Sequence, residues 1–274
     1  MLSNTASANA PARDPGPSPA THRFGFVPLG IGDLFSAAHY PTSLLLVADD
    51  QRLLIDCPSP LLRMLRDASA TSGIAVGLDD IRHVILTHLH GDHAGGLECV
   101  GFHGRFNSHK PAHLWTLPEI AADLWEHRLR ASMAYDLDAD SSLIECYRLE
   151  DFFNLHLLSP DRPTQIANVT VHVRRTRHAP PCFGLKVFFE GRSLGYSSDT
   201  AYDSHHVAFL EECDVIIHET GHGIHTPYEA LASLPESVRR KIRLIHIEDD
   251  LEAARLQLPL LDEGKYYQVL SPEC

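Results

Sequence analysis

The 274-residue sequence is poor in methionine and tryptophan, with three and two of them, and its six cysteines include no C-x-x-C pair. The cysteines are scattered at positions 57, 99, 146, 182, 213 and 274. A chain of this length can bury a core without the help of disulfides. We therefore expect reduced and mostly buried thiols, with metal ligation by cysteine as the alternative.

Positive charge is also scarce, because 23 Lys and Arg stand against 36 Asp and Glu, for a net charge of −13. Binding to duplex nucleic acid requires a basic face, so large nucleic acids are not expected partners. No apolar run approaches the roughly 20 residues that span a bilayer. The first residues lack the basic and apolar regions of a secretory signal. These absences predict a cytoplasmic protein without a membrane partner.

The chain divides into a leader and one domain. Residues 1–22 are rich in Ala, Pro and Ser and are expected to be a disordered leader, with a targeting segment as the alternative. Residues 23–274 are expected to form a single domain, in which short apolar runs alternate with turn signals.

The periodicity of these runs predicts strands and helices in a repeated order. The expected strands are Phe24–Leu29, Ser43–Ala48, Arg52–Asp56, Ile81–Thr87, Ala112–Trp115, Val169–Arg175, Phe183–Phe189, Ser193–Ser197, Asp214–His218, Ile242–Ile247 and Tyr266–Leu270. The expected helices are Pro60–Ala68, Pro118–Leu129, Asp203–Glu211, Pro227–Leu234 and Leu251–Leu261. In both halves hairpins come first and strand–helix alternation follows. Two similar α/β halves are therefore expected to pack sheet against sheet, with helices outside.

Histidine, in contrast, is abundant, at 19 residues. The central stretch is H-L-H-G-D-H at positions 88–93, directly after a predicted strand. His88 and His90 are two residues apart, so an extended backbone turns both rings to one side. Gly91 allows a change of direction, after which Asp92 and His93 begin a helix and can point to a second position nearby. Imidazole and carboxylate groups are suitable ligands for zinc and related divalent ions.

This stretch resembles the H-x-H-x-D-H signature of the metallo-β-lactamase superfamily, and four further motifs of that superfamily occur in its order. They are matched by Asp56 in L-I-D-C, His178 in R-H-A-P, Asp199 in Y-S-S-D-T and His246 in L-I-H-I. The resemblance implies an α/β fold, a four-layer αβ/βα sandwich with two metal ions at the sheet edges. Residues 23–274 would then be one metallo-hydrolase domain.

The resemblance also implies a role for each matched residue. The ligands would be His88, His90 and His178 for metal one, Asp92, His93 and His246 for metal two, and Asp199 as the bridge between the ions. Asp56 would lie behind the ligands and orient them or a water molecule. Zinc is the expected metal because His90 stands where diiron relatives carry glutamate; manganese and iron are the alternatives.

Two other stretches, G-Y-S-S-D-T at 195–200 and V-I-I-H-E-T at 215–220, are similar to the ribonuclease Z and phosphodiesterase branch. The sequence P-C-F-G after His178 also fits this branch. True β-lactamases usually carry cysteine or no bridging carboxylate at the position of Asp199. However, His178 and Asp199 are too close in sequence for the long tRNA-gripping arm of ribonuclease Z. The resemblance without this arm implies a smaller substrate than tRNA.

The resulting hypothesis is a dinuclear metal-dependent hydrolase that uses a metal-bridging hydroxide on a small phosphodiester. Asp92 is expected to accept the proton of the nucleophile as well as to bind metal two. Glu219 and His225 are expected to protonate the leaving oxygen, with His222 as the alternative donor. A lactonase, thioesterase or arylsulfatase-like hydrolase on the same centre is the runner-up, and a non-catalytic metal-binding sensor or scaffold is the alternative from another class. Relatives are often dimers, so a homodimer is a further expectation.

Other polar and aromatic residues have a structural interpretation first. We expect His205 and His206 to be solvated on a polar helix, and Trp115 and Trp125 to lie in the core or an interface. The basic run R-R-T-R at 174–177 is expected at a solvent-facing strand edge, with attraction of a phosphate or carboxylate as the alternative. A role in a substrate loop is the alternative for three histidines after the central motif: His103, His109 and His113.

Overall fold

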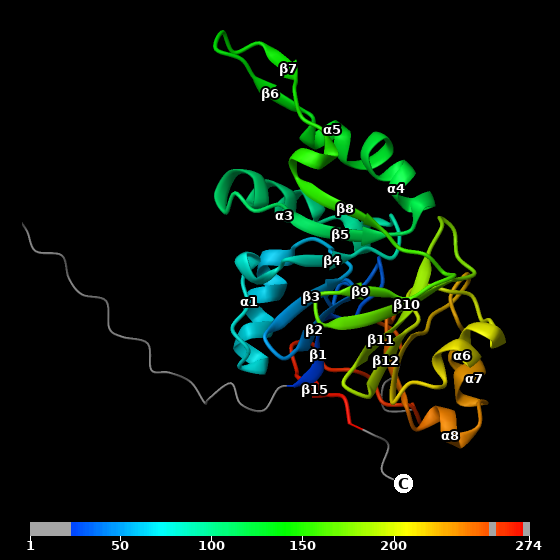
Figure 1. Cartoon of the computed structure of the whole chain (residues 1–274). Helices are drawn as coiled ribbons and strands as arrows, with labels where there is room; N and C mark the ends of the chain where they lie inside the picture. Colours follow the sequence, from blue (N-terminus) through cyan, green and yellow to red (C-terminus); the bar gives the residue numbers. More distant parts are fainter. Residues whose placement is uncertain (1–22, 252–255, 271–274) are drawn as a thin grey trace, which may run out of the picture.

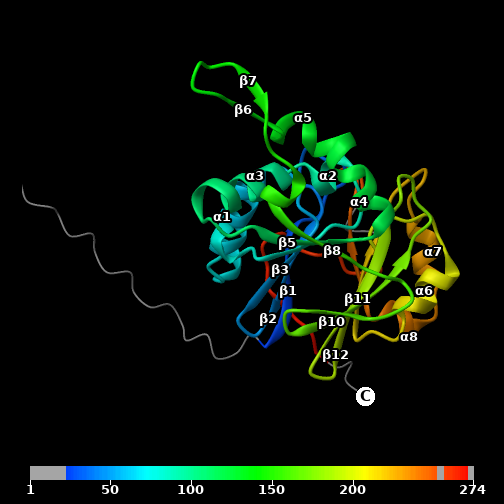
Figure 2. The ribbon, with the colours of Figure 1, turned by 45° about the horizontal axis from the view of Figure 1, so that its top comes forward.

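The computed structural model describes residues 23–251 and 256–270. Two sheets lie face to face in it, and helices cover the outer side of each (Figures 1 and 2). The leader expected for residues 1–22 and the middle of the helix expected over Leu251–Leu261 lie outside the described residues.

The first sheet has seven strands in the order β15-β1-β2-β3-β4-β5-β8. Its strands are β1 (Phe24–Gly30), β2 (Ser43–Ala48), β3 (Gln51–Ile55), β4 (His83–Ile85), β5 (Ala112–Thr116), β8 (Phe153–Leu157) and β15 (Tyr267–Gln268). Strand β2 pairs antiparallel with both β1 and β3, and β3, β4, β5 and β8 run parallel to one another. The helical segments of this half are α1 (Leu61–Ser72), η1 (Leu78–Asp80), α2 (Gly91–Ala94), α3 (Leu97–Phe102), η2 (His103–Asn107), α4 (Pro118–Leu124), η3 (Trp125–Leu129), α5 (Arg130–Met133) and η4 (Leu149–Asp151).

The second sheet has six strands in the order β14-β13-β12-β11-β10-β9. Its strands are β9 (Thr164–Ile166), β10 (Val169–Arg175), β11 (Phe183–Phe189), β12 (Arg192–Tyr196), β13 (Val215–Glu219) and β14 (Ile242–Ile245). The helices of this half are α6 (Ser204–Leu210), α7 (Tyr228–Ala232) and α8 (Glu236–Arg239). Only the β11–β12 hairpin lies between His178 and Asp199, as expected.

The core lies between the two sheets because each presents an apolar face to the other. One buried cluster contains side chains of both sheets, among them Leu46 of β2 and Val187 of β11. A second cluster joins Val207 and Leu210 of α6 to Ile216 of β13. These contacts confirm the predicted packing of sheet on sheet with helices outside.

The helix predicted over Leu251–Leu261 is wrong in its described part. Residues 256–261 form no helix, and Leu260 instead bridges to Leu244 at the end of the second sheet. Proline cannot donate an N–H and clashes with the preceding helical turn, so Pro259 disfavours a helix here. The carbonyl of Pro259 accepts the Leu244 N–H, which extends the edge of the sheet.

A two-stranded hairpin projects from the body after α5 (Figures 1 and 2). Its strands are β6 (Tyr135–Leu137) and β7 (Leu143–Glu145), which pair only with each other. Sequence analysis does not predict this hairpin. No helix within the described ranges is long and apolar enough to cross a membrane.

The cysteines of the described residues form no disulfide. Three of them, Cys57, Cys182 and Cys213, are buried, as predicted for reduced thiols. Cys146 departs from this expectation because it is exposed beside the projecting hairpin.

Candidate metal centre

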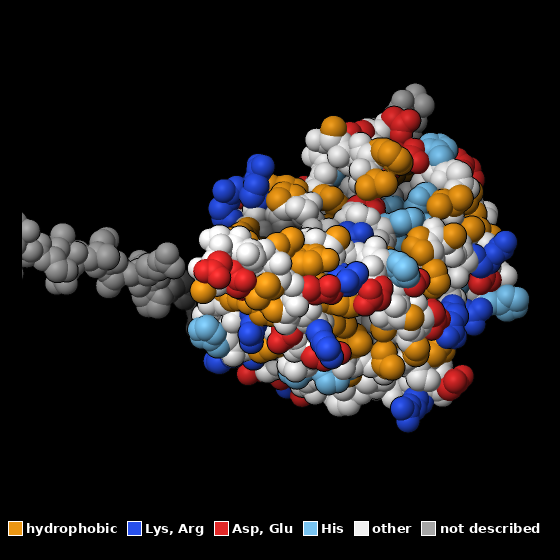
Figure 3. Space-filling model, turned by 90° about the horizontal axis from the view of Figure 1, so that it is seen from above, with side chains coloured by type: hydrophobic (Ala, Val, Ile, Leu, Met, Phe, Trp, Pro, Cys, Tyr) orange, Lys and Arg blue, Asp and Glu red, His pale blue; other side chains and the backbone are white. Residues whose placement is uncertain are grey.

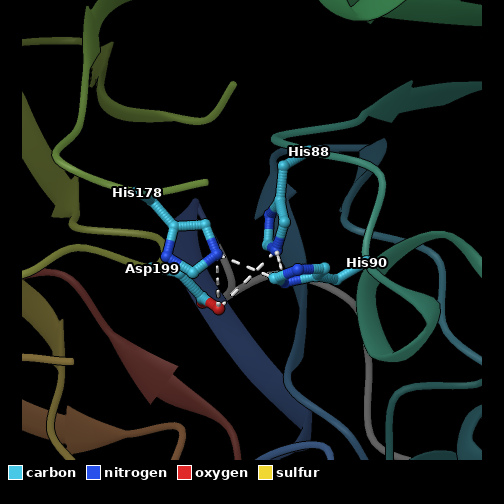
Figure 4. Close-up of side chains that lie close together, drawn as sticks. All are labelled: His88, His90, His178 and Asp199. Carbon is cyan, nitrogen blue, oxygen red and sulfur yellow. Dashed lines mark hydrogen bonds and ion pairs between the residues drawn. The ribbon is translucent and has the colours of Figure 1, made fainter. Parts of the chain in front are cut away.

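Three histidine rings and one carboxylate converge where the two sheets meet, as Figure 4 shows. Nδ1 of His90 lies 3.2 Å from Nε2 of His88 and 3.2 Å from Nε2 of His178. Oδ2 of Asp199 lies 3.6 Å from Nε2 of His88 and 3.8 Å from Nε2 of His178. Four ligand atoms thus surround one position.

A second group, formed by Asp92, His93 and His246, also lies against Asp199. Nε2 of His93 lies 3.4 Å from Oδ2 of Asp92 and 3.3 Å from Oδ1 of Asp199. Nε2 of His246 lies 3.5 Å from Oδ2 of Asp199. The Asp199 carboxylate therefore contacts both groups, which is the geometry of a bridging ligand.

The fold brings these residues together at the ends of strands. His88 and His90 follow β4, and Asp92 and His93 lie in the short helix α2. In the second sheet β12, β13 and β14 run parallel, so Asp199 and His246, which follow β12 and β14, meet at the same edge. Ligands in open α/β sheets bind outside the carboxyl ends of the strands for this reason. Histidine side chains are visible in a hollow of this face (Figure 3).

Buried hydrogen bonds fix the orientation of the rings. Asp56, in left-handed backbone with φ 60°, accepts the Nδ1–H of His93 at 2.9 Å and the N–H of Thr87 at 2.8 Å. The Thr87 hydroxyl donates to Asp56 and lies 3.0 Å from Nδ1 of His88. In both histidines Nδ1 is thus occupied, and Nε2 faces the ligand cluster.

His246 is held in the same way from the first sheet. Its Nδ1 lies 3.1 Å from the hydroxyl of Thr42, which itself donates to the carbonyl of Gly32. The hydroxyl must therefore accept from Nδ1–H, and Nε2 is left to face Asp199. His246 also adopts left-handed backbone with φ 56°, a conformation that the surrounding structure must stabilise.

The donor set fits divalent metal ions. Nε2 of His93 and Oδ1 of both Asp92 and Asp199 are buried without a hydrogen-bond partner, an arrangement that is costly unless a cation lies between them. Burial lowers the pKa of His88 well below its ordinary value and that of His178 to about 4, so both rings are neutral, as metal ligands must be.

The charges of the second group also require a cation. Although burial acts to lower the pKa of His93, the carboxylates of Asp199 and Asp56 raise it well above its ordinary value. Burial likewise acts to raise the pKa of Asp199, but the surrounding histidines, His246 first, hold it well below the usual range. Positive charge is therefore favoured next to Asp199, where either a proton or a metal ion can supply it.

Glu219 and His225 form a pair beside the centre. The Glu219 side chain is buried at the end of β13, and its Oε2 lies 3.3 Å from Nδ1 of His225. The ring of His225 lies 5.1 Å from that of His246 and 5.9 Å from that of His178. Burial raises the pKa of Glu219 to about 7. Burial lowers the pKa of His225, but the hydrogen bond and charge of Glu219 raise it above its ordinary value.

The other histidine candidates lie outside this cluster. His222 is exposed and forms an ion pair with Glu248. The remaining three pair elsewhere: His103 with Asp79, His109 with the carbonyl of Arg105, and His113 with His156.

The prediction that His205 and His206 are both solvated is wrong for His206. His205 is exposed, but His206 is fully buried under α6, where its Nε2 lies 3.1 Å from the carbonyl oxygen of Ser197. Gly184 makes room for the ring, because a Cβ there would lie 2.6 Å from it. The two tryptophans, Trp115 and Trp125, are half-buried against the core.

The arginines of the basic run lie at a strand end and are paired. Arg174 forms an ion pair with Asp203 at 3.8 Å, Arg175 pairs with Glu119, and Arg177 donates to the carbonyl of Tyr202. Arg175 and Arg177 are exposed and Arg174 is partly buried. No side-chain contact links the three arginines to the ligand cluster among the residues described.

Sequence reasoning missed the residues that support the ligands. Thr87, Thr42 and Ser198 hold ligands or each other, and Arg128 donates to the backbone of the central motif. Thr87 could have been found from its position directly before His88. The other three lie far in sequence from the residues that they hold, and only the fold brings them together.

Comparison with known proteins identifies relatives of the chain. The family described as "Anti-Pycsar protein Apyc1" matches residues 24–266. An Apyc1 protein of Paenibacillus sp. (strain J14) is 33% identical over 239 residues, which cover 83% of this chain and 90% of that protein. The cGMP-dependent 3′,5′-cGMP phosphodiesterase A of Dictyostelium discoideum is 24% identical over 259 residues, which cover 88% of this chain and 28% of that protein.

Solved structures share the fold of this chain. YhfI of Bacillus subtilis, described as a metallo-β-lactamase fold protein, matches with a TM-score of 0.69 at 16% identity and covers 89% of this chain and 98% of its own. The short form of human tRNase Z matches with a TM-score of 0.65 at 18% identity, covering 90% and 99%. These likenesses confirm the predicted α/β metallo-β-lactamase fold.

Proposed function

This chain belongs to the anti-Pycsar Apyc1 family, and from that premise we propose that it hydrolyses 3′,5′-cyclic nucleotides at a dinuclear metal centre. It is a metal-dependent hydrolase of the phosphodiesterase type. The observation that carries the dinuclear proposal is the buried carboxylate of Asp199, which lies within 4 Å of histidines of both ligand groups: His178 of the first, and His93 and His246 of the second. The relative described as a 3′,5′-cGMP phosphodiesterase supports a cyclic nucleotide as the substrate.

The proposal assigns metal one to His88, His90 and His178, and metal two to Asp92, His93 and His246, with Asp199 between them. When bound, such ions lower the pKa of a water nucleophile and neutralise the charge that develops on the phosphoryl oxygens. Asp56 and Thr87 keep the ligand rings in place. Asp92, whose Oδ1 has no partner in the described protein, can accept a proton from the attacking water as well as bind an ion.

Glu219 and His225 supply the proton that the leaving group needs. Hydrolysis adds water to phosphorus and breaks the bond to the 3′ oxygen, which leaves as an alkoxide unless it is protonated. His225 faces the cluster and Glu219 is buried behind it, so the imidazolium can give up its proton at the cluster. The product is a 5′-mononucleotide.

The ester-hydrolase alternatives share the same ligands and are separated by experiment. We would purify the protein without added metal, count the bound ions by elemental analysis, and assay 3′,5′-cyclic nucleotides beside a lactone, a thioester and a sulfate ester. Two ions per chain and turnover of cyclic nucleotides alone are expected. Turnover restricted to a lactone or thioester would overturn the assignment, and bound metal without any turnover would favour a sensor or scaffold.

A matched pair of variants tests the centre itself. Asp199→Asn removes the proposed bridge, whereas Asp250→Asn changes a carboxylate in the exposed group of His222, Glu248 and Asp250. The first should lose at least one ion and most activity, and the second should keep both. Equal metal content in the two variants would contradict the bridging role.

Zinc, the cytoplasmic location and the homodimer are parts of the same proposal. Elemental analysis identifies the metal. The hairpin β6–β7 supports self-association because it exposes apolar side chains, with Leu137 61% and Leu143 69% accessible. Light scattering on wild type and on a Leu137→Ser, Leu143→Ser variant measures the oligomeric state, and a monomeric wild type would contradict the dimer.

A further inference from the structure

Arg128 connects the helical segment before the hairpin to the central motif. It lies in η3, a π-helical turn between α4 and α5, and its Nη1 donates to the carbonyl of Leu89 at 3.1 Å. Leu89 stands between His88 and His90, and the two residues of this hydrogen bond are 39 positions apart in sequence. The guanidinium thus holds the backbone from which two proposed ligands of metal one project.

Arg128 has no acidic partner in the part of the chain that the structure describes, and the Leu89 carbonyl is the acceptor that its side chain contacts. Its Nε is buried without a hydrogen-bond partner. Arg130, by contrast, forms a bidentate ion pair with Glu145, in which its Nε and Nη2 donate to the two carboxylate oxygens at 2.8 and 2.9 Å. A half-buried guanidinium without a counter-charge is unfavourable unless its N–H groups are hydrogen-bonded, so the hydrogen bond to the Leu89 carbonyl is the contact that holds this side chain in place.

His90 and His178 are the histidine ligands whose outer ring nitrogen has no hydrogen-bond partner among the described residues, and of the two only His90 lies in the central motif. His88, His93 and His246 each have Nδ1 held by a hydroxyl or carboxylate. For His90, whose Nδ1 faces the cluster, no partner holds Nε2 among the described residues. Its ring position is therefore determined by the main chain, where its carbonyl accepts the N–H of Ala94 at 2.9 Å and the preceding carbonyl accepts Arg128.

We propose that Arg128 is a positioning residue for metal one, since its hydrogen bond to the Leu89 carbonyl fixes the backbone that presents His88 and His90. This inference rests on the proposed metal centre. It goes beyond it by assigning part of the affinity for one ion to a side chain that does not touch the ion.

The charge of Arg128 and its hydrogen bond to Leu89 should have opposite effects on the affinity for metal. A guanidinium near a divalent cation repels it, so loss of the charge alone would tighten metal binding. Loss of the hydrogen bond releases the backbone of His88 and His90 and would weaken binding. Removal of groups that orient metal ligands typically costs about 10–100-fold in metal affinity. The direction of the change therefore identifies which effect dominates.

The test compares Arg128→Met, Arg128→Lys and the control Arg130→Met. Methionine keeps an apolar stem for packing but removes the donor, and lysine keeps one donor and the charge. The affinity of the metal-free proteins for zinc is measured by competition with a chromogenic chelator, and the ions per chain by dialysis at fixed free zinc. Circular dichroism and thermal melts verify that each variant is folded.

We expect Arg128→Met to bind one of the two ions roughly 10–100-fold more weakly, Arg128→Lys to lose less, and Arg130→Met to match wild type. Unchanged or tighter binding by Arg128→Met, or equal weakening by Arg130→Met, would overturn the inference. If Arg128→Met does not fold, weaker zinc binding by Arg128→Lys than by Arg130→Met decides for the inference, and equal binding decides against it. If wild type binds a single ion, the dinuclear centre is overturned, but the affinity for that ion still tests the role of Arg128. If wild type binds no ion, both the metal centre and the role of Arg128 are overturned.

Discussion

At the scale of single residues, the centre depends on which ring nitrogen of each histidine is already occupied. Asp56 holds Nδ1 of His93 and Thr42 holds Nδ1 of His246, so both rings present Nε2 to Asp199. Glu219 has a different role, because its buried carboxylate accepts the N–H groups of Thr200 and Thr226 and faces His225. Under the proposed function, Glu219 governs the protonation of His225 and binds no ion.

Glu219→Gln should therefore lower turnover of cyclic nucleotides without loss of metal. Glutamine can still accept both backbone N–H groups through its carbonyl but cannot stabilise the imidazolium. Proton transfer of this kind contributes about 10²–10⁴-fold, which is the expected drop in kcat. The measurement is kcat for a cyclic nucleotide beside elemental analysis, with the surface variant Glu229→Gln as control.

A substrate whose leaving group needs no proton should not depend on Glu219. Bis(p-nitrophenyl) phosphate releases a stable phenolate that needs no proton, so Glu219→Gln should hydrolyse it almost as fast as wild type. An equal loss for both substrates would show that Glu219 acts on the metals or the fold instead.

At the scale of elements, helix α6 supports the loop that carries Asp199. His206 of α6 contacts the carbonyl of Ser197, and the hydroxyl of Ser197 accepts the N–H of Glu219 at 2.9 Å. Burial lowers the pKa of His206 to about 3, and that of His218 to about 4. Both rings are neutral in the folded chain, and neither side chain could be placed in the core from sequence alone.

Because of these two rings, the free energy of unfolding should decrease as the pH is lowered. Between about pH 6.5 and pH 3–4, each of these histidines is protonated in the unfolded chain but stays neutral in the folded chain. In this range each ring lowers the free energy of unfolding by about 1.4 kcal/mol for every unit by which the pH falls. Denaturation of metal-free protein at pH 7.5 and 4.5 gives the free energy of unfolding that is lost on acidification. This loss should be smaller for His206→Gln than for wild type, and it should be unchanged for the exposed control His205→Gln. Identical losses in all three proteins would contradict the assignment.

Gly184 is the glycine of the P-C-F-G stretch, and the packing of α6 explains it. A Cβ at this position would lie 2.5 Å from the carbonyl oxygen of Ser197 and 2.6 Å from the ring of His206. Gly184→Ala should therefore destabilise the fold by roughly 1–3 kcal/mol. Urea denaturation measures the change, and Gly77→Ala is the control because its Cβ has open space apart from Asp80 at 4.0 Å. No difference between the two variants would refute the steric explanation.

The limits of prediction from sequence also lie at this scale. The H-L-H-G-D-H stretch could be interpreted because ligand types at short spacing follow from local backbone geometry. The strands of the hairpin β6–β7 have three residues each and show no alternation long enough to detect. Arg128 and Thr42 act across long sequence separations, so their roles depend on tertiary packing that no local pattern encodes.

At the scale of the whole molecule, the proposed metal ions join the two sheets. The first half supplies His88 to His93 and the second supplies His178, Asp199 and His246. Ions that bind only the folded chain stabilise it by mass action, by about 4 kcal/mol at about 1,000 times their Kd. Chelation therefore releases a contact that no side chain replaces.

Addition of a chelator should lower the melting temperature by roughly 10 °C, because 1 kcal/mol corresponds to about 2–4 °C in a domain of this size. Calorimetry with and without chelator measures the shift, and readdition of zinc should restore it. Asp199→Asn should respond less than wild type. An unchanged melting temperature after addition of the chelator would contradict the proposal that metal ions join the two sheets.

The division of the ligands between the halves also sets an order in time. During synthesis the chain emerges from its N-terminus, so the four proposed ligands of metal one leave the ribosome before His246 does. Metal two must wait for His246 and for β14, which pairs with β13. The first site can therefore be occupied while the second is still incomplete. A chain truncated between residues 199 and 246 would keep the four proposed ligands of metal one and lack His246 of metal two, so we expect it to hydrolyse nothing.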